Sequence, residues 1–286
     1  MKPLAQTTKF LAPLIGALVL LVLPATGDTI AFFYALDADL QGLKTLAREA
    51  GQSISVGTRT IQRLRLGSHA IYAVKMGSGA VETAASAQAL LARHRCDWAF
   101  SLGPAGALAE SVETGKWYRA GRVVAWQHGS SSLASSSDFP VWDTDWARFP
   151  VATAPPPLET TATLVVASGE QFISTAADRD RLRALAQAEA VDMNSHGLAL
   201  VCADHGVPLF SWKIVSDRAD ENAAETFKGF VASYAGEGGK ALAEIVAALP
   251  ANPNDPRSYP AIEAALREPG APGGVSRTAA DRPDRP

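Results

Sequence analysis

The sequence has only two cysteines, Cys96 and Cys202, among 286 residues. Two cysteines cannot form the multi-bridge framework of a small secreted scaffold, and each lies in a mainly apolar stretch that is typical of a buried side chain. The sequence also lacks an excess of basic residues, since 26 Lys and Arg stand against 29 Asp and Glu. Without a basic stripe to displace counterions, we expect no nucleic-acid partner.

Several enzyme motifs are absent as well. The sequence contains no Gly-x-Ser-x-Gly elbow, no Walker A loop, no His-Glu-x-x-His and no Cys-x-x-Cys. Its five histidines are scattered along the chain. We therefore expect neither a metal site nor a bound cofactor.

The two ends of the chain differ in composition from its body. Residues 1–27 contain two lysines, an uncharged apolar run from Phe10 to Leu23 and a small-residue end. That run is shorter than the roughly 20 apolar residues of a membrane span, so it predicts a signal peptide and a periplasmic or secreted protein with no membrane contact after cleavage. An uncleaved N-terminal membrane anchor is the alternative. Residues 251–286 are rich in proline, glycine and arginine, which predicts a disordered tail.

Residues 28–250 have the pattern of one folded domain. Apolar runs typical of buried strands, such as residues 29–35 and 98–102, alternate with helical stretches such as residues 81–91 and 223–249. This alternation predicts an α/β, single-domain three-layer fold, with a central mixed, mainly parallel sheet flanked by helices. Residues 130–157 are the least regular, and they are either a lid or a surface loop.

Acidic residues follow the ends of several expected strands, where open α/β sheets bind their ligands. Asp37 and Asp39 follow the first strand, and Asp217 follows the last. Two well-separated carboxylates suit cleavage of a glycosidic bond, because one donates a proton and the other activates water. For Asp37 and Asp217 a helix N-cap remains the alternative role.

Five segments occur in a fixed order along the body: residues 35–40, 75–79, 101–106, 168–173 and 191–220. Among them are Ser168-Gly-Glu-Gln-Phe-Ile173 and Ile214-Val-Ser-Asp217. Together they resemble the nucleoside phosphorylase family, and most closely its methylthioadenosine/S-adenosylhomocysteine nucleosidase branch. The resemblance runs from Ile30 to about Leu249.

The resemblance implies a role for each matching residue. Asp217 is implied to be the general acid that protonates purine N7, and Asp39 takes the place of the glutamate that activates the attacking water. The implied substrate-binding residues are Phe172 against the purine face, the Ile173 backbone at the purine edge, Met193 against ribose, Phe227 near the 5′ substituent, and Met76, Gly79, Asn194 and Ser216.

Three of these positions depart from the family pattern. Asn194 stands where the family has a glutamate that binds ribose hydroxyls, and it lacks the strength of a charged acceptor. Met76 replaces a serine, and Asp39 is one methylene shorter than the usual glutamate. The sugar-binding set is thus altered while the acid is retained.

Three functions follow as alternatives. We expect hydrolysis of an adenosine-type purine nucleoside, because the places where related phosphorylases carry arginine offer no cation for phosphate. A phosphorylase, with Lys75 as its cation, is the second alternative. A non-catalytic nucleoside-binding protein outside the cytoplasm is the third. The resemblance also implies a homodimer, with residues 130–149 closing the neighbouring site.

Overall fold

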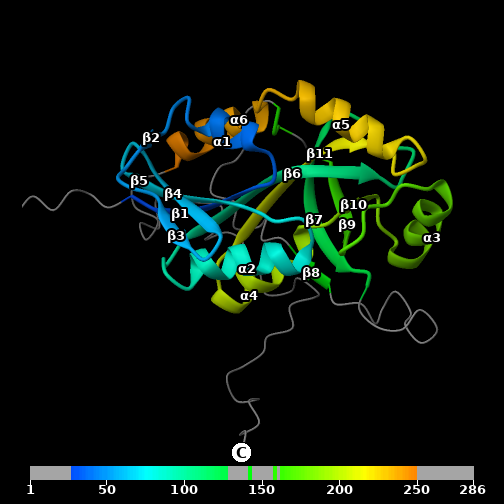
Figure 1. The fold of residues 1–286 in the computed structure, drawn as a ribbon, viewed down its shortest axis with the longest axis horizontal. Coiled ribbons are helices and arrows are strands. Elements are labelled where there is room, and N and C mark those ends of the chain that lie inside the picture. Colours follow the sequence, from blue (N-terminus) through cyan, green and yellow to red (C-terminus); the bar gives the residue numbers. More distant parts are fainter. Residues whose placement is uncertain (1–26, 128–140, 144–156, 160–161, 250–286) are drawn as a thin grey trace, which may run out of the picture.

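A computed structural model describes residues 27–127, 141–143, 157–159 and 162–249 (Figure 1). The expected signal peptide, the expected tail and most of the irregular 130–157 segment lie outside these residues. Within the described part of the chain, no helix combines the length and apolarity needed to cross a membrane.

The strands of the described residues form one mixed sheet in the order β10-β9-β7-β11-β6-β1-β5-β4-β2, with β3 paired to β4 and β8 to β7. Their bounds are β1 Thr29–Tyr34, β2 Arg48–Glu49, β3 Ile54–Val56, β4 Arg59–Leu66, β5 His69–Lys75, β6 Trp98–Ala107, β7 Trp117–Ala125, β8 Val141–Asp143, β9 Thr163–Ser168, β10 Ala190–Asp192 and β11 Leu209–Asp217.

Parallel pairing dominates the middle of the sheet, where β5, β1, β6 and β11 run side by side. Strand β7 is antiparallel to β11 and parallel to β9. Strand β10 pairs with both β9 and β6, so β6, β11, β7, β9 and β10 close into a small barrel. The barrel brings β10 and the end of β11 beside the last residues of β6, since Val191 and Asp217 both pair with Gly106.

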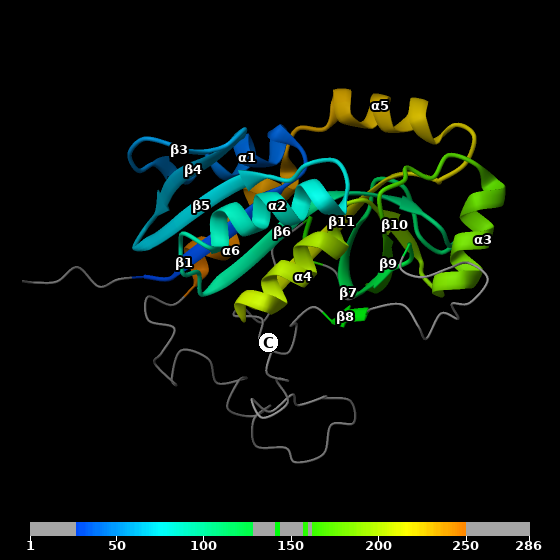
Figure 2. The same ribbon diagram turned by 60° about the horizontal axis from the view of Figure 1, so that its bottom comes forward.

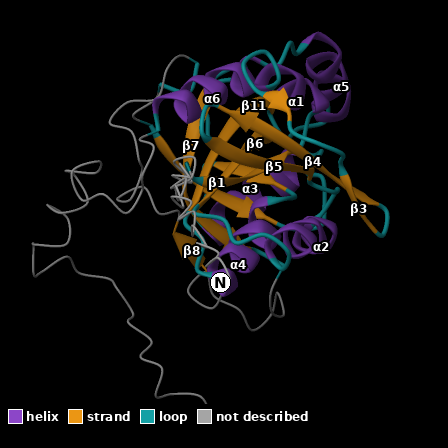
Figure 3. Ribbon diagram, turned by 90° about the vertical axis from the view of Figure 1, so that its left-hand side faces the viewer, coloured by secondary structure: helices purple, strands orange, loops and turns teal. Residues whose placement is uncertain are grey.

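Helices cover both faces of the sheet, which gives the expected three layers (Figure 3). Helices α1 (Asp37–Leu43) and α6 (Glu237–Ala248) pack together on one face, and α2 (Ala80–Leu91) and α4 (Ser195–His205) on the other. Helices α3 (Ala176–Ala186) and α5 (Ala223–Ser233) lie at the periphery (Figure 2). The predicted α/β class is confirmed.

Strand β1 shows why helices pack on both faces of the sheet. Phe32 and Tyr34 face a core shared with α1 and α6, whereas Ala31 and Phe33 face a core shared with α2 and α4. Successive side chains of a strand point to opposite faces, so a continuous apolar run is buried only between two helical layers. Each fully buried Phe contributes about 2 kcal/mol through removal of apolar surface from water.

The helix expected over residues 223–249 is in fact two helices, α5 and α6. Gly236 between them adopts φ +76°, a conformation that glycine reaches without a steric penalty. A Cβ at this position would lie 2.1 Å from the carbonyl oxygen of Ala38 in α1. The break therefore allows the chain to turn and to pass close against α1.

Both cysteines are buried free thiols. Burial raises the pKa of Cys96 to about 12 and also raises that of Cys202, so both thiols stay protonated and unreactive. The described residues contain no group of three or more His, Cys, Asp or Glu side chains arranged to hold a metal ion.

Candidate active site

A cavity of about 380 Å³ opens at the carboxyl ends of the central strands. Its described lining comes from the loop after β1, from the end of β5 and the loop after it, from the last residues of β6, β10 and β11, from the two residues after β10, and from Phe172 and Phe227. This is the place where open α/β sheets hold ligands. Seven of the expected site residues line it: Met76, Phe172, Met193, Asn194, Ser216, Asp217 and Phe227.

Asp217 forms the acidic end of this cavity. It is 2% exposed and follows a bulge in the pairing of β11 with β6. Its carboxyl oxygens accept the backbone N–H of Ala219 at 2.9 Å and the hydroxyl of Ser216 at 2.8 Å. Burial raises the pKa of Asp217, although these two hydrogen bonds act in the opposite direction. A buried carboxyl of this kind retains its proton at a higher pH than an ordinary aspartate does.

The backbone beside Asp217 is strained. Ala219 adopts φ +50°, a left-handed conformation that costs a residue with a Cβ about 1 kcal/mol or more. In this conformation its N–H is directed at Asp217. The strain thus fixes the position of the Asp217 carboxyl within the cavity.

Aromatic and thioether side chains supply the apolar part of the lining. The rings of Phe172 and Phe227 meet edge to face at a centroid distance of 5.8 Å. Phe172 is 38% exposed, so one side of its ring is open to a flat ligand. Met76 and Met193 add flexible apolar surface from β5 and β10. The cavity can therefore hold a planar base against apolar side chains, with Asp217 to donate a proton.

An ion pair that the sequence did not reveal lies under the cavity, between Asp192 and Lys213. Lys213 Nζ lies 2.6 Å from Asp192 Oδ2, and both side chains are 1% exposed. Asp192 also accepts the Ser195 hydroxyl at 2.7 Å and the Asn194 backbone N–H at 3.3 Å. Burial alone would raise the pKa of Asp192, but the charge and hydrogen bond of Lys213, with the hydroxyls of Ser195 and Ser168, together lower it.

The start of α2 is already occupied by carboxylates. Glu82 accepts the backbone N–H of Ser78 at 3.2 Å, and Glu170 accepts that of Val81 at 2.9 Å. A helix N-terminus with free N–H groups is a ready site for phosphate. These two side chains instead place negative charge there.

Lys75, the cation on the cavity wall, has a partner of its own. Its Nζ lies 2.6 Å from Asp37 Oδ2, with both side chains more than half exposed. Asp37 therefore neutralises the charge that a phosphate ion would need at this position.

Asp39 does not line the cavity, which corrects its expected role. It is fully buried in α1, and its Oδ1 accepts the Tyr234 hydroxyl at 2.5 Å and the Gly239 backbone N–H at 3.1 Å. Gly236 and Gly239 bring α6 so close to α1 that Asp39 faces α6. A carboxylate in this position joins two helices and lies outside the described lining of the cavity.

Two further expected residues lie beside the cavity lining. The Ile173 side chain is 3% exposed and packs in the core near Trp126 and Leu182. Gly79 begins α2 with φ +102°, and a Cβ there would lie 2.0 Å from the Glu170 carboxyl. Gly79 thus allows Glu170 to approach the helix start.

Another hollow, of about 660 Å³, lies between residues 91–97 and 205–208. Its arginines, Arg93 and Arg95, follow the C-terminal end of α2, where positive charge stabilises the helix dipole. None of the expected site residues lines it.

Comparison with known proteins identifies the family. The sequence profile of the phosphorylase superfamily matches residues 23–249. Aminodeoxyfutalosine nucleosidase of Helicobacter pylori strain J99 is 35% identical over 82 residues, which cover 29% of this chain and 36% of the relative. The Campylobacter jejuni enzyme of the same name is 35% identical over 71 residues, 25% of this chain and 31% of the relative. The chain thus spans about a third of the length of these curated relatives.

Solved structures share the fold at low identity. A futalosine hydrolase mutant of Helicobacter pylori aligns with a TM-score of 0.69 and 20% identity, over 77% of this chain and 98% of the other. The 5′-methylthioadenosine/S-adenosylhomocysteine nucleosidase of Neisseria meningitidis, in complex with methylthio-immucillin-A, aligns with a TM-score of 0.67 and 21% identity, over 78% and 100%. With the profile match over most of its length, this chain belongs to the phosphorylase superfamily.

Proposed function

We propose that this chain is a purine nucleoside N-glycosidase that hydrolyses an adenosine-type nucleoside of the methylthioadenosine or S-adenosylhomocysteine kind. The observation that carries the proposal is Asp217, a buried carboxyl with a raised pKa at one end of a cavity lined by Phe172 and Met193. The nucleosidases among the relatives and structural neighbours support the same class of reaction.

The reaction begins with protonation of the base. Asp217 donates its proton to the purine, and the electron pair of the glycosidic bond leaves with the base. Positive charge develops on the sugar as in other glycoside cleavages, and a water molecule adds to the anomeric carbon. The proton released by that water restores Asp217, so nucleoside and water become base and free sugar.

Most of the acceleration then comes from the acid. Among the described residues that line the cavity, Asp217 and Asp192 are the carboxylates, and Asp192 is held in its ion pair with Lys213. Water therefore attacks a sugar whose leaving group has already been neutralised.

Hydrolysis is favoured over phosphorolysis by the charges around the cavity. The carboxylates of Glu82 and Glu170 occupy backbone N–H groups at the start of α2, and Asp37 pairs with Lys75. A phosphate ion would meet negative charge at each of these places, whereas phosphate sites need fixed cations.

The test is base release from purified mature protein given adenosine, methylthioadenosine or inosine, with and without phosphate. Release of base and free sugar without phosphate is the expected result. Release only with phosphate would establish a phosphorylase. Tight binding without release would establish a nucleoside-binding protein.

We also propose that the chain acts outside the cytoplasm as a homodimer. Residues 1–27 support export, by their charge and apolar run. Phe172 and Val231, at 38% and 41% exposure, leave apolar surface open on the β9–α3 loop and on α5. Cell fractionation, and light scattering of the purified protein, test these two points separately.

A further inference from the structure

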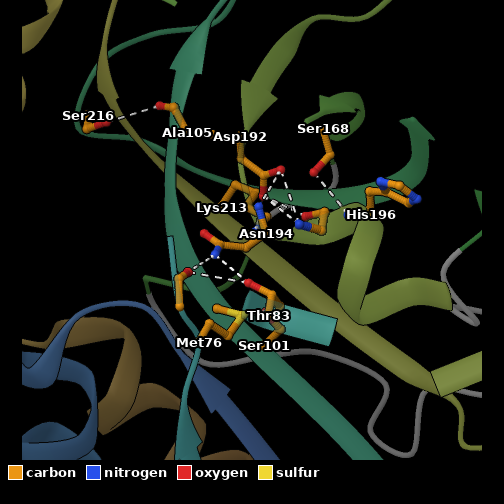
Figure 4. Close-up of polar contacts among 12 residues, drawn as sticks. Met76, Thr83, Ser101, Ala105, Ser168, Asp192, Asn194, His196, Lys213 and Ser216 are labelled. Atoms are coloured by element: carbon orange, nitrogen blue, oxygen red, sulfur yellow. Dashed lines mark hydrogen bonds and ion pairs between the residues drawn. The ribbon is translucent and has the colours of Figure 1, made fainter. Parts of the chain in front are cut away.

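The side chain of Asn194 is held by a small closed set of hydrogen bonds (Figure 4). Its Nδ2 donates to the backbone oxygen of Gly77 at 2.6 Å and to the Thr83 hydroxyl at 2.8 Å. The Thr83 hydroxyl in turn donates to the same Gly77 oxygen at 3.4 Å. Residues of β10, of α2 and of the loop before α2 thus meet at one amide group.

These contacts determine which end of the amide faces the cavity. A backbone carbonyl only accepts hydrogen bonds, so the group that faces Gly77 is the NH₂ of Asn194. Both N–H bonds of that group are used, one by Gly77 and one by Thr83. The remaining polar atom, Oδ1, is turned away from Thr83 (Figure 4), and Asn194 lines the cavity.

We infer that Thr83 positions Asn194 so that its side chain presents one neutral acceptor to the sugar, and that the 2′,3′-diol is recognised through a single hydroxyl. This inference rests on the proposed function, with the nucleoside sugar beside Asn194 as the family resemblance implies. A carboxylate here would offer two charged oxygens, one for each hydroxyl. The amide offers one, because its other end is fixed to the protein.

Thr83 is suited to this task by its burial. Its side chain is 0% exposed in the first turn of α2. The Thr83 hydroxyl is the second acceptor of the Asn194 NH₂ group, and an amide N–H that loses its acceptor costs free energy, so Thr83 helps to hold the orientation that the Gly77 carbonyl sets.

A single acceptor has a distinctive signature in binding. We would measure the affinity of the Asp217→Asn protein for adenosine, 2′-deoxyadenosine, 3′-deoxyadenosine and 2′,3′-dideoxyadenosine. One monodeoxynucleoside should bind as tightly as adenosine. The other should bind about tenfold more weakly than adenosine, and as weakly as the dideoxynucleoside. A tenfold loss of affinity is the loss expected for one neutral hydrogen bond. Losses that accumulate from each deoxygenation would overturn the inference.

Substitutions at Thr83 separate positioning from a purely structural role. Thr83→Val keeps the shape and removes the hydroxyl, so it should bring the affinity for adenosine down to that for the sensitive deoxynucleoside. Thr83→Ser should restore the difference in affinity between adenosine and that deoxynucleoside. Ser86→Ala is the matched control, because Ser86 is a buried hydroxyl one turn further along α2 that accepts from Arg59 instead; it should leave the difference intact.

The outcomes distinguish this inference from the proposed function. If Thr83→Val unfolds at a much lower temperature than the wild-type protein, Thr83→Ala takes its place. Thr83→Ala and the wild-type protein are then compared at a temperature where both are folded. The wild-type protein could release base while the Thr83 variants keep an unchanged difference in affinity between adenosine and the deoxynucleoside. That result would overturn the inference and support the proposed nucleosidase. Failure to bind or to cleave adenosine, methylthioadenosine and inosine alike would overturn both.

Discussion

Lys213 Nζ lies 2.6 Å from Asp192 Oδ2, and neither side chain is more than 1% exposed. The pair joins the end of β10 to the middle of β11, directly beneath Met193 and Asn194. Asp192 also binds the backbone N–H groups of Asn194 and Ser195. The ion pair therefore holds the loop that carries the sugar end of the proposed site.

Lys213→Met should lower the free energy of unfolding by about 3–5 kcal/mol, because it leaves a buried carboxylate without its counter-charge. Urea unfolding of the variant and the wild type measures the loss. The double variant Lys213→Met/Asp192→Asn should recover much of it, since replacement of both charges removes the unpaired ion. A loss below about 1 kcal/mol in the single variant would show that water reaches the pair.

Asp39 should affect the pH dependence of stability and leave catalysis nearly unchanged. Burial raises the pKa of Asp39 to about 6, although hydrogen bonds from Tyr234 and Gly239 oppose the shift. In the unfolded chain the pKa of an aspartate is about 4. Between these values the folded protein binds more protons than the unfolded chain. The free energy of unfolding therefore falls as the pH rises from about 4 to 6.

Asp39→Asn cannot ionise and should flatten this part of the stability profile, while base release continues. Urea unfolding at pH 5 and pH 8, with the rate of base release at pH 7, checks both statements. A rate of base release by Asp39→Asn as low as that of Asp217→Asn would show that Asp39 takes part in the reaction.

Phe172→Leu should weaken nucleoside binding about tenfold, because it removes the aromatic face and the edge contact with Phe227. Calorimetric titration of adenosine into the Asp217→Asn background measures the loss. Leu200→Ala is the matched control, since Leu200 has the same 38% exposure and lies outside the described cavity lining. Equal losses in the two variants would show that the effect is general and not due to stacking.

The sequence predicts well what depends on local pattern. The continuous apolar run of β1 indicated a strand buried on both faces, and Phe32 and Phe33 indeed enter two separate cores. Positions at strand ends gave Asp217, Met193 and Asn194, because open α/β sheets bind their ligands outside the carboxyl ends of strands. These predictions need only the order of elements.

The errors arise where distant segments meet. Asp39 follows the first strand as expected, but the close approach of α6 at Gly236 and Gly239 turns it away from the cavity. The three glycines at 236, 238 and 239 were the visible signal of that approach. They also mark the break between α5 and α6, which a helical spacing pattern overlooks.

The charged residue within β11 was a further signal. Lys213 stands between Trp212 and Ile214 in a strand that is buried along its whole length, and a lysine so placed requires a buried partner. That partner, Asp192, and the link from Thr83 to Asn194 depend on contacts between residues 21 and 111 positions apart. A linear pattern shows the need for such a partner without giving its identity.

The pH profile of base release should fall on the alkaline side because of Asp217. The pKa of this carboxyl is raised by burial, and only the protonated form can donate to the base. The rate should therefore be highest at acidic pH and should decline as the pH rises through the raised pKa. Asp217→Asn cannot donate a proton, so it should lose base release, retain nucleoside binding and show no such decline in any residual activity. Rates measured from pH 4 to pH 9 with saturating nucleoside follow the acid in the complex, and Asp37→Asn is a control at an exposed carboxyl near the same cavity. A decline that persists unchanged in Asp217→Asn would assign the proton to another group.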